Sequence, residues 1–381
     1  MMKGKGWIIL IVLLLIPLFT EGCWNRRELN KLGIVSAIGI DVGEDQKITY
    51  TVQIVKTSAL KSSSEGISGS SDASYVMTSS GDTVFDAVRN LVTQSGRKLY
   101  YPHNIVIVLG GDMAKKGVQP VLDLFSRDQE MRLLTWVVVT NGKAADIVKA
   151  DSPVENISAR HLDSLLKDYG VASKAVAVHL LDFENEMLDE SLQPVVGRVE
   201  LDESDDKSFV LKGAGVFRKD KLIGWLDPLS SRGYLWIQDK VKSGIINVPD
   251  PEQENQLISL EIKKAGRKIK PYVENGKVKY RIEINVESVV GEETGTADLT
   301  NPEVMAAIED EQSTAVEKEV NQIINDAQGK FKVDILGLGD ETARKLPQEW
   351  KEMKEGWEDI FPDVEVEVTV KSRITNFGLK T

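Results

Sequence analysis

The chain has 381 residues, 41% of them hydrophobic and 28% charged, which leaves room for two or three globular domains with real cores. Its formal net charge of −12 argues against a nucleic-acid partner, because phosphate binding needs clustered Lys and Arg. The single cysteine excludes a framework of internal disulfides.

The first 22 residues have the pattern of a secretory signal peptide. Lys3 and Lys5 form a positive start, and an apolar run follows from 7 to 19. This run is too short for a membrane span of about 20 residues, but it fits the apolar part of an export signal, about 7–15 residues long. We therefore expect the folded part of the chain to lie outside the cytoplasm, as in Gram-positive bacteria, where exported proteins without disulfides are common.

Cys23 follows this run and is preceded by the small residue Gly22. A cysteine in this place is typical of lipoproteins, in which the chain is cleaved before it. We expect a diacylglycerol on its sulfur and an N-acyl chain, and no other cofactor. Each buried CH₂ of the lipid contributes about 0.8 kcal/mol of membrane affinity. The alternatives are an uncleaved signal anchor and a buried free thiol.

The next residues, Trp24, Arg26, Arg27 and Glu28, lie close to this expected anchor. Tryptophan favours the membrane interface, and arginine suits specific ion pairs. We predict that the segment docks on a membrane-embedded partner. A plain spacer is the alternative.

Residues 23–203 predict an α/β region with up to two subdomains. The runs 33–41 and 48–55 predict a β-hairpin, and the Ser- and Gly-rich stretch 57–74 predicts a mobile loop. Strands then alternate with helices, which indicates a layered domain. We expect strands at 75–79, 105–109 and 133–139, and helices at 113–126 (with a break or start at Pro120), 144–150, 158–169 and 173–188.

One further helix is predicted between the expected strands 75–79 and 105–109. Asp82 is its expected cap and Gly96 its end. Its expected inward face consists of Val84, Phe85, Val88, Leu91 and Val92.

The acidic stretch 202–206 predicts a turn or linker, and we place the main domain boundary between 203 and 204. It lies among expected strands at 195–201, 209–217 and 222–226. Residues 204–381 predict an α+β domain of antiparallel strands with one polar face and a long helix packed on them. The fold class expected for the whole chain is α/β and α+β: multidomain, with mixed and antiparallel sheets flanked by helices.

Local signals within this second domain are specific. Asn275 and Gly276 predict a type I′ turn between two amphipathic strands. Asn301 and Pro302 predict the cap and first turn of a long helix that Gly329 ends. We expect further strands at 331–336 and 364–370, and a short helix near 348–357.

The histidines and two glycine motifs are candidates for metal and dinucleotide sites. His103, His161 and His179 lack metal-ligand spacing, so we expect them to be structural or solvated. Each of the motifs Gly213–Gly215 and Gly337–Gly339 is only G-x-G, which favours tight turns or close packing over a dinucleotide loop.

Two other groups leave alternatives open. The basic cluster consists of Lys263, Lys264, Arg267, Lys268 and Lys270. It faces either anionic lipid headgroups or solvent at a hairpin edge, and we favour the latter. The tryptophans Trp225, Trp236 and Trp357 are either interface anchors or core residues.

A family resemblance rests on four stretches in order. They are Cys23–Trp24 with Arg26-Arg27-Glu28-Leu29 and strand 33–41; 103–108 with 114–117; 213–217 with 221–226; and 334–339. These resemble the Ger(x)C lipoproteins, the C subunits of spore-germination receptors, over nearly the whole mature chain. Thr20 and Glu21 depart from the usual lipobox.

The resemblance implies a non-enzymatic subunit on the outer face of the spore inner membrane. Such a subunit works with two multispanning proteins, the receptor A and B subunits, to detect nutrients and trigger germination. Known members have several α/β domains around mixed sheets. The alternatives are a solute-binding lipoprotein that delivers a small molecule to a transporter and, more weakly, an extracytoplasmic hydrolase.

Overall fold

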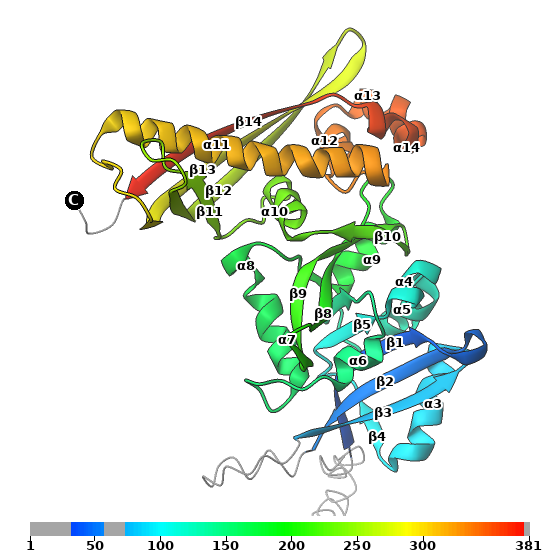
Figure 1. Cartoon of the computed structure of the whole chain (residues 1–381). Helices are drawn as coiled ribbons and strands as arrows, with labels where there is room; N and C mark the ends of the chain where they lie inside the picture. The colour runs from blue at the N-terminus through cyan, green and yellow to red at the C-terminus, as the bar shows by residue number, and fades with distance from the viewer. Residues whose placement is uncertain (1–31, 57–72, 377–381) are drawn as a thin grey trace, which may run out of the picture.

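The computed structural model describes residues 32–56 and 73–376, and two β-sheets organise this part of the chain. In Figure 1 the ten-stranded first sheet fills the lower half of the molecule and the four-stranded second sheet lies at the top, with helix α10 (Pro228–Ile237) between them. The expected fold class of mixed and antiparallel sheets with flanking helices is confirmed.

The first sheet is mixed. Its strand order is β10-β9-β8-β6-β5-β1-β2-β3, with β4 beside β1 and β7 beside β6. Neighbours among β8, β6, β5 and β1 are parallel, whereas both flanks are antiparallel. The strands are β1 (Leu32–Val42), β2 (Ile48–Val55), β3 (Ser74–Gly81), β4 (Lys98–Tyr100), β5 (Val106–Leu109), β6 (Trp136–Val139), β7 (Val178–His179), β8 (Val195–Asp202), β9 (Asp205–Arg218) and β10 (Lys221–Leu226).

Helices cover both faces of this sheet, as the alternating pattern predicts. One face packs on α3 (Val84–Ser95), α4 (Gly111–Lys116), α5 (Gln119–Arg127) and α9 (Leu180–Leu188). The other packs on α6 (Ala144–Lys149) and α7 (Ser158–Lys167), which α8 (Tyr169–Ala172) follows. The predicted hairpin of β1 and β2 is confirmed by their antiparallel pairing. Of the predicted loop 57–74, residues 57–72 lie outside the described residues, and Ser74 already belongs to β3.

Helix α3 differs from its prediction in cap and face. Thr83, not Asp82, caps it by accepting a hydrogen bond from the Asp86 N–H. The residues buried against the sheet are Val84, Ala87 and Leu91, while Phe85 is 50% and Val92 40% exposed. The helix approaches β3 closely on this face: a Cβ on Gly81 would lie 2.4 Å from the Ala87 nitrogen, so only glycine fits at 81.

Other boundaries shift for local reasons. The predicted helix 113–126 is two helices, because Gly117 (φ +124°) separates α4 from α5, and Pro120 lies in the first turn of α5. The predicted strand 133–139 begins only at Trp136. The predicted helix 173–188 contains strand β7 before α9.

The acidic stretch 202–206 contains the turn of a β-hairpin. Asp202 pairs with Asp205, and β8 and β9 pair antiparallel on either side of this turn. Strand pairing within the first sheet therefore crosses the position predicted as the domain boundary, and the chain leaves that sheet only after Leu226.

The second sheet has the order β11-β12-β13-β14. Its strands are β11 (Ile245–Pro249), β12 (Leu257–Glu274), β13 (Lys277–Glu293) and β14 (Val366–Asn376). The type I′ turn is confirmed, since Asn275 (φ 51°) and Gly276 (φ 73°) both have positive φ between β12 and β13. Helix α11 (Pro302–Asn325) packs on this sheet and is capped by Asn301, as predicted.

The expectation of a purely antiparallel second sheet is wrong at β14, which runs parallel to β13. The connection between them contains a long helix, and such a crossover brings the chain back in the same direction. The outer edge of β14 is covered by α11: Glu309, Ser313 and Glu317 accept hydrogen bonds from the backbone N–H groups of residues 374, 372 and 370.

The predicted strand 331–336 is also wrong. After α11, a π-helical turn (Asp326–Phe331) contains Gly329, the predicted helix end, and an irregular segment follows. There the buried carboxylate of Asp334 accepts the N–H groups of residues 336–339 and the Trp357 Nε1–H, which replaces strand pairing. The helices beyond it are α12 (Leu338–Lys345), α13 (Pro347–Met353) and α14 (Trp357–Ile360).

The two halves share one core at α10. Val195, Ala214 and Val216 of the first sheet pack in the same apolar cluster as Ile258, Ile282 and Val320 of the second half. The second half is therefore held against the first sheet by side-chain packing, in addition to the covalent link.

Candidate functional site

The residues predicted to meet the membrane, Cys23, Trp24, Arg26, Arg27 and Glu28, lie outside the described residues. Lipidation at Cys23 and docking through the other four residues therefore stay predictions. Within residues 32–56 and 73–376, no helix has the length and apolar character needed to cross a bilayer.

The three histidines lie in separate aromatic surroundings. His179 stacks on Trp136 with ring centroids 3.7 Å apart, and burial lowers the pKa of His179. His161 lies 5.1 Å from the Phe209 ring and His103 5.7 Å from that of Tyr100. In the described part of the chain, no group of three or more His, Cys, Asp or Glu side chains is arranged to hold a metal ion.

The two G-x-G motifs make close contacts in different places: Gly213–Gly215 lies within strand β9, and Gly337 directly precedes helix α12. Gly213 (φ +80°) and Gly337 (φ +75°) have positive φ, which favours glycine. A Cβ on Gly215 would lie 2.8 Å from the Leu222 side chain, and one on Gly339 would lie 2.5 Å from the Ser191 side chain. Close packing is confirmed at Gly215 and Gly339, while Gly213–Gly215 lies within strand β9 and not in a tight turn.

Most of the basic cluster is paired with carboxylates. The ion pairs are Lys263–Glu261 (2.6 Å), Lys264–Glu287 (3.6 Å), Arg267–Glu341 (2.9 Å) and Lys270–Glu283 (2.9 Å). These partners neutralise much of the charge along β12 and β13, which favours the solvated hairpin edge over contact with headgroups.

Of Trp225, Trp236 and Trp357, the last two belong to the core. Trp236 and Trp357 are each 2% exposed. Trp225 is half-buried, and the guanidinium of Arg198 lies over its ring, 4.5 Å from the centroid. Neither buried ring is available as an interface anchor.

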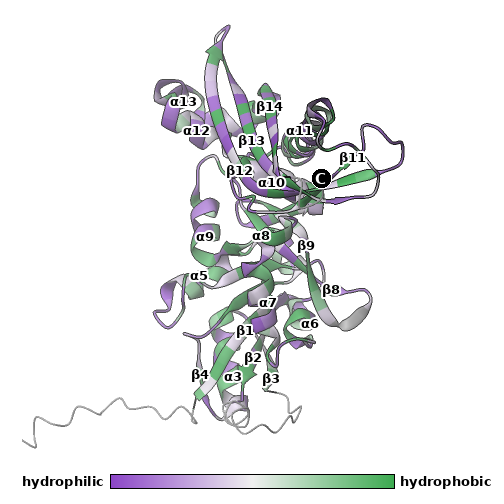
Figure 2. Ribbon diagram, turned by 90° about the vertical axis from the view of Figure 1, so that its left-hand side faces the viewer, coloured by the Kyte–Doolittle hydropathy of each residue, from purple (hydrophilic) through white to green (hydrophobic). Residues whose placement is uncertain are grey.

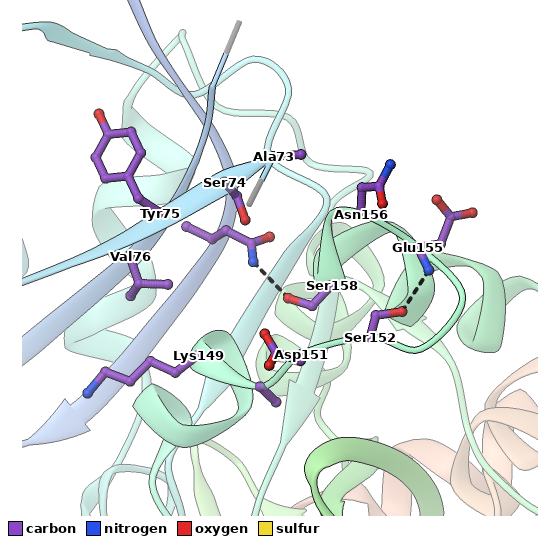
Figure 3. A pocket seen from close by; sticks show the side chains of 12 residues that line it. Ala73, Ser74, Tyr75, Val76, Lys149, Asp151, Ser152, Glu155, Asn156 and Ser158 are labelled. Atoms are coloured by element: carbon purple, nitrogen blue, oxygen red, sulfur yellow. Dashed lines mark hydrogen bonds between the residues drawn. The ribbon is translucent and has the colours of Figure 1, made fainter. Parts of the chain in front are cut away.

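A polar pocket opens where β2 and β3 meet the loop between α6 and α7 (Figure 3). Its volume is about 410 Å³, within the range of small-molecule sites. Lys149, Asp151 and Glu155 bring both signs of charge to its lining, and Tyr75 adds an aromatic ring. A small polar molecule carrying both charges matches this lining.

The wall of the pocket is built around the buried amide of Gln53. Its Nε2 donates to Ser158 Oγ (2.7 Å), and its Oε1 accepts from Ser36 Oγ (2.9 Å) and the Ala159 N–H (3.3 Å). The amide thus joins β1, β2 and the start of α7. Sequence reasoning missed this residue, although a glutamine between Val52 and Ile54 in a strand rich in β-branched residues was a usable signal.

We expect Gln53→Ala to lower the free energy of unfolding by about 1–3 kcal/mol, because it leaves the buried hydroxyls of Ser36 and Ser158 without their amide partner. Denaturant unfolding measures the change. Asn156→Ala, at an exposed position on the same pocket, is the control and should change little. Equal stability of the two variants would contradict a structural role for Gln53.

Known families match both halves of the chain. Residues 25–201 match the model of the spore germination protein N-terminal domain, and residues 212–378 match that of the spore germination B3/GerAC-like C-terminal domain. Spore germination protein KC of Bacillus subtilis (strain 168) is 28% identical, with 98% of this chain and 96% of the relative covered. Spore germination protein A3 of the same organism is 26% identical over 98% of both chains.

A solved structure also resembles this fold. The crystal structure of the GerBC protein aligns with a TM-score of 0.57 at 20% identity, covering 89% of this chain and 97% of that one. At this identity the match concerns the fold alone, and it agrees with the mixed sheets and flanking helices described above.

Proposed function

Because the chain belongs to the Ger(x)C family of spore germination proteins, we propose that it is the lipid-anchored, non-enzymatic C subunit of a nutrient germinant receptor. It acts with two integral membrane subunits, the receptor A and B subunits, to trigger germination. The observation that carries the proposal is the extent of the match: both family models and relatives covering 98% of the chain agree.

The expected place of the protein is the outer face of the spore inner membrane. The signal-peptide pattern of residues 1–22 and the position of Cys23 directly after it support this location, and Trp24, Arg26, Arg27 and Glu28 are the proposed docking segment for a membrane-embedded subunit. The relatives are germination proteins by name, which supports a non-catalytic role.

A second candidate is a solute-binding lipoprotein that delivers a small molecule to a transporter. The pocket of about 410 Å³ beside Gln53 favours it, because its lining carries both Lys149 and the carboxylates of Asp151 and Glu155. A protein of this kind binds its solute without the membrane subunits.

Affinity isolation of the tagged protein from detergent-solubilised spore membranes tests the receptor role. We expect the native form to recover two multispanning partners. Cys23→Ala is expected to lose the membrane fraction and most of both partners, because single-chain or absent lipidation gives only marginal anchoring.

The controls separate the candidates. Retention of both partners by Cys23→Ala would assign assembly to the folded domains rather than to the lipid. If the complex still assembles after alanine replacement of Arg26 and Arg27, the proposed docking role of that segment is wrong. Recovery of no membrane partner by the native form would contradict the receptor role and favour the solute-binding alternative.

A further inference from the structure

Three leucines form an exposed apolar surface beside the first sheet, in the turn before β6 and at the start of α9. Leu133, Leu134 and Leu181, here called the leucine surface, are 39%, 70% and 37% exposed. The Leu181 N–H donates to the Leu133 carbonyl (3.0 Å), and the Leu180 N–H donates to that of Thr135 (2.9 Å), so these residues are held together by the backbone. Contiguous exposed apolar patches rimmed by polar residues are typical of protein or membrane interaction sites.

Leu133 and Leu134 lie outside the strand predicted for them, and Leu181 lies in the first turn of α9. Thr135 N–H donates to the Arg132 carbonyl in a turn, and regular pairing of β6 starts only at Trp136. Met131 packs on the core, but the two leucines that follow point away from it. The turn thus presents apolar side chains that the sheet does not bury.

This surface lies at the end of the sheet where the described chain begins. Leu32 pairs with Lys98 of β4, and Lys98 Nζ lies 2.7 Å from Glu130 Oε1, in the loop that carries Leu133 and Leu134. Figures 1 and 2 both show β4 at the bottom of the molecule, far from the second sheet. The loop is therefore beside the start of β1.

The distance to the expected lipid is short. Leu32 lies nine positions after Cys23, and nine residue steps span at most about 32 Å when fully extended. A lipid on Cys23 would therefore keep this end of the sheet near the bilayer, whereas the second half of the chain lies at the opposite end (Figure 1).

Charge beside the leucines suits a lipid surface. Arg97 and Arg132 are exposed, and among the described residues neither guanidinium has an ion-pair partner. Arginine near an apolar patch places its charge at headgroup phosphates while its neighbours enter the boundary region. The exposed carboxylate of Asp182, next to Leu181, opposes this attraction, so the leucines supply the main contact.

We propose that the leucine surface contacts the lipid bilayer directly, with Arg132 facing phospholipid headgroups. The inference rests on the proposed lipid anchor at Cys23 and adds an orientation to it. The end of the first sheet that contains β4 and the start of β1 faces the membrane, and the second sheet lies on the side away from the membrane.

A site-specific fluorophore tests this contact in the full mature protein. Lipidation blocks the only native thiol, so Leu134→Cys supplies the single reactive one. The labelled protein is reconstituted into vesicles of phosphatidylglycerol and phosphatidylethanolamine. We expect a blue-shifted emission and strong quenching by nitroxide-bearing lipids. The matched control is Leu188→Cys, a 75% exposed leucine at the other end of α9, which should stay water-exposed.

The outcomes separate the two proposals. The mass of the mature N-terminus is measured first, and an unmodified Cys23 would remove the anchor and this inference together. With the anchor present, equal emission of the 134 and 188 labels would overturn the bilayer contact alone. Shielding at 134 only when the membrane subunits are added would assign the leucine surface to a protein partner and likewise overturn the lipid contact.

Discussion

Replacement of Glu319 by alanine is expected to lower the free energy of unfolding by about 3–5 kcal/mol, because it leaves a buried arginine without its counter-charge. The Arg232 side chain is 4% exposed. Its Nε donates to Glu319 Oε2 (2.9 Å), a second guanidinium nitrogen bonds Glu319 Oε1, and Nη1 donates to the Ile245 carbonyl (2.9 Å). Trp236 Nε1 also donates to Glu319 (3.0 Å).

This ion pair joins α10, the link from the first sheet, to α11 on the second. Denaturant unfolding measures the loss, with Glu311→Ala, at an exposed position of α11, as the control that should change little. A double variant, Arg232→Met with Glu319→Leu, should recover most of the stability, since replacing both charges leaves no buried ion. A Glu319→Ala protein as stable as the control would contradict the role of this pair.

Replacement of Glu341 by glutamine is expected to cost about 2 kcal/mol at pH 7, a value reduced for the solvent around its partners. The carboxylate is 7% exposed and bonds Arg267 (2.9 Å), Arg344 (2.5 Å) and Lys345 (2.8 Å). Burial alone would raise the pKa of Glu341, but the hydrogen bonds from Arg344, Lys345 and Arg267 outweigh it and lower the pKa to about 2.

The lowered pKa predicts a pH dependence. The unfolded chain binds a proton at Glu341 near pH 4.5, while the folded protein keeps the carboxylate charged down to about pH 2. The stabilisation is therefore fully present above pH 4.5 and is lost as the pH falls through the folded pKa. Unfolding curves of the native protein and Glu341→Gln should converge between pH 5 and 2. A constant difference over that range would show that ionisation of Glu341 does not stabilise the fold.

Much of the fold follows from local pattern. Alternation of apolar residues places Tyr280, Ile282 and Ile284 on the buried face of β13, and they are at most 1% exposed. The Asn275–Gly276 turn and the Asn301 cap depend only on neighbouring residues, so they are readable without any partner. The family resemblance is also readable from the sequence alone, because it rests on motifs in a fixed order along the chain.

The candidate site could be read only in part. The expected anchor and docking residues come from the order of signal, Cys23 and basic segment, which sequence displays directly. The pocket wall depends on a contact between Gln53 and Ser158, 105 positions apart, and no local pattern encodes that distance. A long polar side chain among buried strand residues indicates that a hydrogen-bond partner exists, but it does not identify that partner.

By itself, the sequence determined most of the strands and helices, the Asn301 cap, the Asn275–Gly276 turn and membership of a germination family, because each depends on periodicity, residue conformation or motif order. Only the tertiary structure decided how these elements meet. It made β14 parallel to β13, left Leu133 and Leu134 outside their strand, and paired Arg232 with Glu319 across 87 positions. The physical reason is that burial and pairing are set by which surfaces come together, and many partners satisfy the same local pattern.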